Sequence, residues 1–389
     1  MKLLVVMPSV DPEAGGPVEV VEKRGTHLQQ LGHRVQVLTL DDPQQSFLHN
    51  YPLPCHALGP SHTGYRYNGK LVPWLTLHAR EYDAVIVEGL WQYCGLGTWR
   101  ALRRTQVPYY VFVHGMLDPW FKRRYPFKHL KKWLYWPWAE YRVLRDARAV
   151  LFTTEQERLL AHRSFWLFRA RERVVTLGTR APPGDGSALR DRFLAAHVPL
   201  QGRRLLLFLG RIHEKKGCDL LIRAFARVAA LEPALHLVMA GPDQTGWLAR
   251  LQQLASELGV ATRISWPGML TGDAKWGALY SAEALVLPSH QENFGIVVAE
   301  ALGCAVPVLI SDKVNIWPEI ESDGAGLVAP DTLAGTEALL RRWLALEPAA
   351  RDRMARQARQ TFTDRYGIDA MAQSLLQVLR ETAPPRATG

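Results

Sequence analysis

The most constraining feature of the sequence is the alternation of short apolar runs with longer amphipathic segments. Runs that are apolar throughout and rich in Val, Ile and Leu are typical of strands buried on both faces of a parallel sheet. The segments between them have the pattern of helices, so the whole chain is predicted to have an α/β architecture with two doubly wound sheets. The predicted strands cover residues 3–7, 35–40, 84–87, 109–113 and 149–152, and then 205–209, 235–240, 263–266, 284–287 and 306–310.

The two strand series are separated by a segment without a strand pattern. It contains Pro182, Pro183, Gly184 and Pro199, a composition typical of a linker. A length of 389 residues also fits two domains. We therefore expect one Rossmann-like domain over residues 1–185, a linker over 186–202 and a second Rossmann-like domain over 203–365. A helical pattern then follows within residues 366–389.

The net charge and the cysteine spacing indicate which partners the protein binds and in which compartment it works. The chain has 47 Lys and Arg against 37 Asp and Glu, a net charge of +10, and most of the surplus lies in the first half. Such an excess favours anionic partners. The four cysteines show no C-x-x-C spacing, which disfavours a zinc or dithiol site. The first apolar run stops at Pro8, too early for a signal peptide. These features predict a cytoplasmic protein without a spanning helix.

Ligands of doubly wound sheets bind beyond the carboxyl ends of the strands, so residues that follow strands are candidates. Gly15 and Gly16 precede a predicted helix, where bare N–H groups suit an anion, although an ordinary glycine turn is the alternative. The pattern is not G-x-G-x-x-G, which disfavours a dinucleotide site. His114 follows the strand at 109–113 and could bind hydroxyls or transfer a proton, or have a structural role.

A basic turn follows the strand at 205–209. Arg211 and Lys216 lie in this turn between two glycines, an arrangement that suits a diphosphate. A solvated basic turn is the alternative, and the Walker A pattern is absent.

The segment after the strand at 284–287 carries two glutamates eight residues apart. Glu292 lies in the loop and Glu300 about two turns into the following helix, so both carboxylates can face one cleft. Carboxylates bind sugar or ribose hydroxyls well. Either glutamate alone could be a capping or solvated acid. The placement of both between two predicted strands favours a binding role.

Four segments together resemble retaining glycosyltransferases of the GT-B fold, in glycosyltransferase family 4. They are the glycine pair at 15–16, HG at 114–115, LGRIHEKKG at 209–217 and SHQENFGIVVAEALGCAVPV at 289–308. The last is the family's E-x7-E element. The resemblance implies two Rossmann-like domains facing across a cleft, the first binding the acceptor and the second the nucleotide-sugar donor. It also implies a C-terminal helix that crosses back to the first domain. It also implies hexose transfer from a nucleotide-diphospho-sugar to a glycan or lipid-linked acceptor, as in surface or exopolysaccharide biosynthesis.

The resemblance also implies roles for individual residues. Arg211 and Lys216 would hold the donor diphosphate, Glu300 the donor ribose, and Glu292 and His114 the transferred sugar. The expected catalytic set is Arg211, Lys216, Glu292 and His114. The implied donor-binding set also includes Gly15, Gly16, Asn293, Phe294 and Gly295. The family requires no metal or cofactor, in agreement with the missing D-x-D pattern. The sequence TLGTR at 176–180 departs from the family's usual P-N-G-V-D turn.

Residues 120–148 mix basic and aromatic side chains more densely than the rest of the chain. This composition suits an anionic membrane surface, and hence a polyprenyl-linked acceptor at the inner face of the cell membrane. A solvated basic helix with its tryptophans in the core is the alternative. Nucleic acid is disfavoured because no binding module is present. The candidate contact residues are Trp120, Lys122, Arg123, Arg124, Lys128, Lys131, Lys132, Trp133 and Trp136.

Two other functions remain open at this point. A GT-B-fold nucleotide-sugar epimerase or phosphorylase would share the fold, but the E-x7-E loop disfavours an epimerase and the missing cofactor-lysine signature disfavours a phosphorylase. The other alternative is a catalytically silent, membrane-peripheral binding protein. It is disfavoured because the chain keeps the family's charged residues Arg211, Lys216, Glu292 and Glu300.

Overall fold

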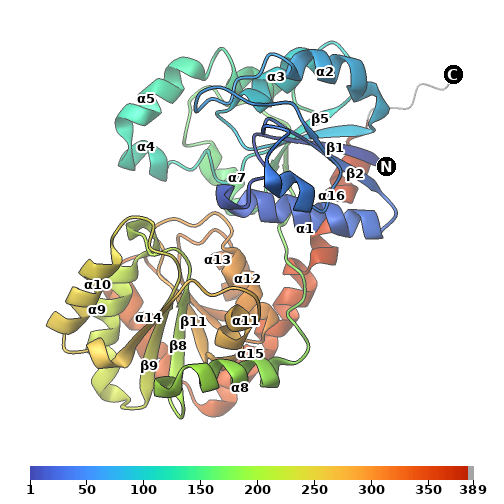
Figure 1. Cartoon of the computed structure of the whole chain (residues 1–389). Coiled ribbons are helices and arrows are strands. Elements are labelled where there is room, and N and C mark those ends of the chain that lie inside the picture. The colour runs from blue at the N-terminus through green and yellow to red at the C-terminus, as the bar shows by residue number, and fades with distance from the viewer. Residues whose placement is uncertain (384–389) are drawn as a thin grey trace. The chain divides into compact units, whose positions relative to one another are not determined.

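The computed structural model describes residues 1–383 (Figure 1). The chain forms two compact units. Unit 1 is built from Met1–Leu177 together with the C-terminal segment that begins at Ile368, and unit 2 is Gly178–Gly367. The chain therefore leaves unit 1, completes unit 2 and returns.

Unit 1 contains a seven-stranded parallel sheet in the order β3-β2-β1-β4-β5-β6-β7. The order reverses beside β1, which pairs with both β2 and β4, as expected for a doubly wound sheet. The strands are β1 (Lys2–Met7), β2 (Arg34–Thr39), β3 (Cys55–Ala57), β4 (Ala84–Glu88), β5 (Tyr109–Phe112), β6 (Ala149–Phe152) and β7 (Glu172–Val174).

The helices of unit 1 include one from the C-terminal end of the chain. That helix, α16, contacts α1, and in Figure 1 the red α16 lies beside the blue α1. Its Ala372 and Leu375 are fully buried in the same apolar cluster as Leu3 and Val5 of β1. The expected return of the C-terminal helix to the first domain is thus confirmed. The helices are α1 (Gly16–Gln30), α2 (Leu71–His78), α3 (Tyr93–Leu102), α4 (Trp120–Arg124), α5 (Pro126–Tyr135), α6 (Glu140–Asp146), α7 (Glu155–Ala161) and α16 (Ile368–Glu381).

Unit 2 contains a second parallel sheet, of six strands in the order β10-β9-β8-β11-β12-β13. Its strands are β8 (Arg204–Leu209), β9 (Leu235–Ala240), β10 (Ile264–Gly268), β11 (Ala284–Leu287), β12 (Val308–Ser311) and β13 (Gly326–Ala329). Its helices are α8 (Gly186–Ala196), α9 (Cys218–Val228), α10 (Leu248–Glu257), α11 (Gly272–Ser281), α12 (Ile296–Gly303), α13 (Trp317–Ser322), α14 (Leu333–Ala345) and α15 (Pro348–Thr361).

The prediction of a linker over residues 186–202 was wrong, because most of this segment is helix α8 of unit 2. The side chain of Asp185 caps the helix by accepting a hydrogen bond from the Ala188 N–H at 3.1 Å. Leu189 and Phe193 are buried on one face, which contacts α11. The proline and glycine cluster therefore marks the turn before a helix, and the chain already enters unit 2 at Gly178.

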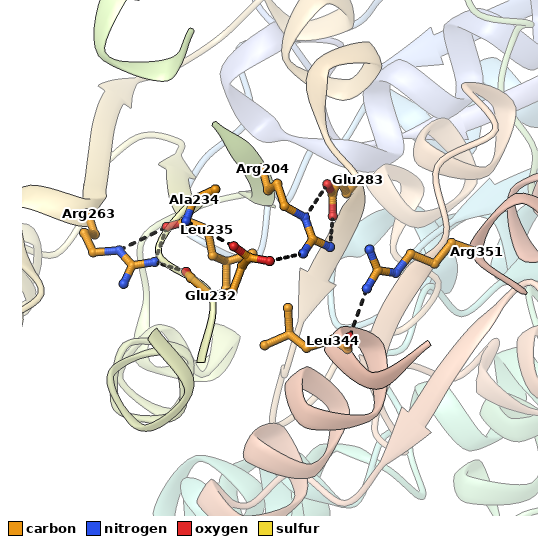
Figure 2. Close-up of polar contacts among 8 residues, drawn as sticks. All are labelled: Arg204, Glu232, Ala234, Leu235, Arg263, Glu283, Leu344 and Arg351. Atoms are coloured by element: carbon orange, nitrogen blue, oxygen red, sulfur yellow. Dashed lines mark hydrogen bonds and ion pairs between the residues drawn. The ribbon is translucent and has the colours of Figure 1, made fainter. Parts of the chain in front are cut away.

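At the amino ends of the strands of unit 2, side-chain ion pairs join neighbouring elements (Figure 2). Arg204, at the start of β8, donates to both carboxylate oxygens of Glu283 at 2.8 and 2.9 Å and to Glu232 at 2.5 Å. Arg263 donates to the carbonyls of Glu232 and Leu235, both at 2.6 Å. These contacts occupy one edge of the sheet, and the loops at the opposite, carboxyl edge carry the predicted site residues.

Candidate functional site

Close backbone approaches bring the loops after β8 and β11 together at the carboxyl edge of unit 2. Gly217 ends the short 3₁₀ turn Glu214–Lys216 with φ 65°, and a Cβ there would lie 2.2 Å from the Pro288 carbonyl oxygen. Only glycine tolerates both the left-handed backbone and this contact. The His290 N–H also donates to the Lys215 carbonyl at 2.8 Å. The basic turn and the E-x7-E loop are therefore parts of one surface.

Lys216 and Glu292 form a direct ion pair across these two loops. Both side chains are largely buried. Burial lowers the pKa of Lys216 to about 7, and the neighbouring charges of Lys215 and Arg211 act in the same direction. The Glu292 loop is itself fixed to the loop after β12, because its N–H donates to the Lys313 carbonyl at 2.9 Å. A cation and a carboxylate thus face each other where the sequence predicted diphosphate and sugar contacts.

Three other predicted donor residues belong to the same two loops, Arg211 after β8 and Phe294 and Gly295 after β11. Arg211 lies on the surface and donates to the Gln244 side chain at 3.3 Å. Gly295 is the N-cap of α12 with φ 76°. The Phe294 ring is buried edge-on against Tyr366, with ring centroids 5.4 Å apart, so it acts as a core side chain. Only the backbone of Phe294 can serve a ligand.

Glu300 lies on α12 and is almost completely buried. Lys275 of α11 donates to its Oε1 at 2.7 Å. The sequence predicted Glu300 but not Lys275, because the lysine lies in helix α11, outside the E-x7-E element. A single lysine on a helix carries no sequence signal of its own.

In unit 1, His114 follows β5 and belongs to a buried charged chain. Its Nε2 lies 2.6 Å from Oε2 of Glu88, the last residue of β4, and Arg24 of α1 contacts the other oxygen. Although burial raises the pKa of Glu88, its contacts with Arg24 and His114 outweigh that effect and hold the pKa below its usual value. The His114 backbone has φ 50°, a conformation that non-glycine residues rarely adopt and that is enriched at functional sites.

A cavity of about 170 Å³ opens beside this chain. The cavity is lined by polar groups at the ends of three strands and by apolar side chains from α1 and nearby loops. The positively charged end of α1, at which Gly15 has φ 95°, adjoins the same strand ends. The cavity is lined by Met7, Pro8, Ser9, Pro17, Val18, Arg66, Glu88, Gly89, Gln92, His114 and Met116.

The structure changes the composition of the predicted membrane-contact set. Trp136 is fully buried, stacks on Phe165 at 4.2 Å and donates its Nε1–H to the Leu167 carbonyl at 2.8 Å. The prediction that Trp136 contacts a membrane was wrong. Trp136 directly follows α5 and packs into the core of unit 1, whereas other side chains of α5 face the surface. Trp120, Trp133 and Lys132 are partly buried, and the ammonium of Lys132 lies 4.4 Å from the Trp91 ring centroid. The other five predicted cations are exposed.

Four apolar side chains that were not predicted are exposed in the same segment. Phe127, Leu130 and Leu134 follow one another along one face of α5, and Trp138 lies beyond its end. Their exposed fractions are 84, 61, 72 and 70%. The α5 ridge, defined as Phe127, Leu130 and Leu134, therefore presents apolar side chains among exposed cations.

Within residues 1–383, every helix is too short or too polar to cross a bilayer. In the same part of the chain, no three His, Cys, Asp or Glu side chains are grouped so as to hold a metal ion.

Two family models match the chain, one in each unit. The model described as Glycosyl transferase 4-like domain matches residues 15–178, and the model described as Glycosyl transferases group 1 matches residues 190–361. Together with the two Rossmann-like sheets and the E-x7-E loop, these matches define the class. The chain belongs to the group 1 glycosyltransferases of the GT-B fold, in family 4.

Individual relatives agree with this class. A D-inositol 3-phosphate glycosyltransferase of Rhodococcus opacus (strain B4) is 31% identical over 248 residues, which are 61% of this chain and 54% of that protein. The solved structure of Anabaena HepE in complex with UDP has a TM-score of 0.78 at 18% identity, with 98% of this chain and 100% of that one covered. The structure of WaaG, a glycosyltransferase involved in lipopolysaccharide biosynthesis, has a TM-score of 0.65 at 18% identity and covers both chains completely. The chain spans about half the length of the curated relatives it matches.

Proposed function

We propose that the chain is a retaining glycosyltransferase that moves a hexose-type sugar from a nucleotide-diphospho-sugar to a glycan or lipid-linked acceptor. The observation that carries this proposal is the joint placement of the Lys216–Glu292 pair and Glu300 at the carboxyl edge of unit 2. A diphosphate needs a cation, and sugar hydroxyls need carboxylates. The same edge supplies both. HepE, a structural neighbour, was solved with UDP bound, which supports a nucleotide donor.

In this proposal Lys216 and Arg211 bind the donor diphosphate and stabilise the negative charge that grows on it as the sugar leaves. Glu300 accepts hydrogen bonds from the ribose. Glu292 accepts them from the transferred sugar, while the backbone N–H groups near Gly295 complete the binding of the donor. His114, oriented by the Glu88–Arg24 pair, binds a further sugar hydroxyl from unit 1.

The proposed mechanism retains the anomeric configuration. The bond from the anomeric carbon to the phosphate oxygen breaks, and the acceptor oxygen forms a new bond to that carbon on the same face. The proton of the acceptor hydroxyl passes to the leaving phosphate. Glu292 is held by Lys216, which suits it to a binding and positioning role rather than to that of a covalent nucleophile. No metal takes part in these steps.

We also propose that the protein works at the inner face of the cell membrane, on a lipid-linked acceptor of surface polysaccharide biosynthesis. The exposed cations around the α5 ridge favour an anionic leaflet, to which each basic residue adds about 1 kcal/mol. WaaG, a structural neighbour, is described as acting in lipopolysaccharide biosynthesis.

Lys216→Met and Glu292→Gln test the proposed activity. Because each variant removes one member of the pair that would contact the donor, we expect transfer from the accepted nucleotide sugar to fall by roughly 10²-fold or more. A thermal-shift panel of nucleotide sugars first identifies the donor, which at 100 times its Kd stabilises the fold by about 2.7 kcal/mol. Arg227→Gln, which breaks an ion pair between α9 and Glu337 of the neighbouring α14, is the matched control.

Wild-type transfer rates in both site variants would disprove the assignment. Conversion of the sugar without an acceptor would indicate the epimerase instead. Donor binding without hydrolysis or transfer to any glycan or lipid acceptor would indicate the silent binding protein.

A further inference from the structure

The buried carboxylate of Glu300 has its own cation. Lys275 Nζ lies 2.7 Å from Oε1, and the two side chains are 21% and 4% exposed, respectively. Burying a carboxylate without a counter-charge costs several kcal/mol. The ammonium of Lys275 therefore compensates the burial of Glu300, a contact made before any ligand arrives.

The position of Lys275 is set by the backbone of α11. Two residues later, Gly277 lies so close to α8 that a Cβ would be 2.5 Å from the Leu189 carbonyl oxygen. This approach fixes α11 against α8, and the Lys275 ammonium lies 4.7 Å from the Trp276 ring centroid. The lysine thus extends from a rigid element toward Glu300.

The contact leaves half of the carboxylate available. Lys275 binds Oε1, and within residues 1–383 the other oxygen, Oε2, has no hydrogen-bond partner. A carboxylate with one oxygen held and the other open presents a single acceptor in a defined direction. Such an acceptor suits one hydroxyl group of a ligand.

We propose that Lys275 is a positioning residue that orients Glu300 toward a ribose hydroxyl, and so sets the preference of this site for ribonucleotide over deoxyribonucleotide donors. The inference rests on the proposed function, in which Glu300 binds the donor ribose. A site built to accept a hydrogen bond from a hydroxyl discriminates strongly against the analogue that lacks it, because the oriented acceptor is left unpaired.

The test measures binding of nucleoside diphosphates to the full chain by titration calorimetry. UDP, GDP and ADP are compared first, and the one that binds is then compared with its 2′-deoxy and 3′-deoxy forms. For Lys275→Met we expect roughly tenfold weaker binding of the ribonucleotide and nearly unchanged binding of one deoxy form, so that the preference disappears. In turnover, the KM for the donor rises while kcat changes little. Lys275→Arg keeps a cation and should retain the preference.

Controls separate this inference from its premise. Asp273→Asn, on the same helix and exposed, should bind like the wild type. Equal losses for the ribo and deoxy forms in Lys275→Met would indicate a merely structural lysine and overturn the inference, as would an unchanged preference. Lys275→Gln replaces Lys275→Met if the latter unfolds. If no nucleoside diphosphate binds the wild type, or Glu300→Gln binds it normally, the proposed function itself fails.

Discussion

At the scale of single residues, the site consists of charges that neutralise one another in the absence of ligand. Lys216 is paired with Glu292, and Lys275 with Glu300. The sequence predicted three of these four residues, because each of the three follows a strand or belongs to a recognisable motif. Lys275, and likewise Arg24 and Glu88 behind His114, could not be predicted, since only the fold brings them to their partners.

If Lys216 binds the donor diphosphate as proposed, its lowered pKa should make donor binding pH-dependent. The lysine is cationic below a pKa of about 7 and loses its charge as the pH rises through that value. Affinity for a nucleotide sugar, whose diphosphate diester keeps its charge over this range, should therefore fall between pH 6 and pH 9, by up to about tenfold per unit. Lys216→Arg stays charged throughout. Titrations at several pH values check this, and a pH-independent wild-type affinity, or an equal slope in Lys216→Arg, would contradict it.

At the scale of elements, the sequence located the central strands well and the edges poorly. All ten predicted strands exist, because a strand buried on both faces needs a continuous apolar run. The three that were missed, β3, β7 and β13, lie at or near sheet edges and are only three or four residues long. Strands this short contain too few residues for a recognisable pattern of apolar side chains. In addition, β3 and β7 are only partly buried. Helix α8 was missed because proline and glycine before it dominated the pattern.

Helix α5 carries a prediction about the membrane. Replacing the α5 ridge with Phe127→Ser, Leu130→Ser and Leu134→Ser removes apolar groups worth about 1.5–3 kcal/mol each when fully buried. We expect more than tenfold weaker binding to vesicles that contain phosphatidylglycerol, measured by co-sedimentation. Leu77→Ser removes an equally exposed leucine from α2 and serves as the control. Equal binding of the triple variant and the wild type would show that the ridge does not enter the bilayer.

At the scale of the whole molecule, one unit is interrupted by the other. The two chain crossings lie side by side within unit 2, where the Thr179 N–H donates to the Tyr366 carbonyl at 2.9 Å and Thr179 pairs with Gly367. A Cβ on Gly178 would lie 2.5 Å from the Gly367 carbonyl oxygen, so glycine is required at this contact. The returning α16 then completes the core of unit 1.

Unit 1 should therefore depend on α16 for its stability, and unit 2 should not. Leu375 is fully buried in the unit 1 core, so Leu375→Ala should lower the free energy of unfolding of that unit by about 2–5 kcal/mol. Calorimetry should show an earlier transition for unit 1, and nucleotide binding to unit 2 should persist above the temperature of that transition. Gln373→Ala, on the exposed face of α16, is the control. Loss of nucleotide binding together with the first transition would contradict independent stability of the two units.

The paired crossings have a consequence for how such proteins can be rebuilt. Because the Thr179 N–H donates to the Tyr366 carbonyl and Thr179 pairs with Gly367, the first and last residues of unit 2 lie side by side. A segment with adjoining ends can be exchanged between relatives as a single cassette with two junctions, and neither junction requires added linker. Under the proposed function, recombination at these two points should alter the choice of donor and leave the cavity beside His114, the α5 ridge and both chain ends in their original context.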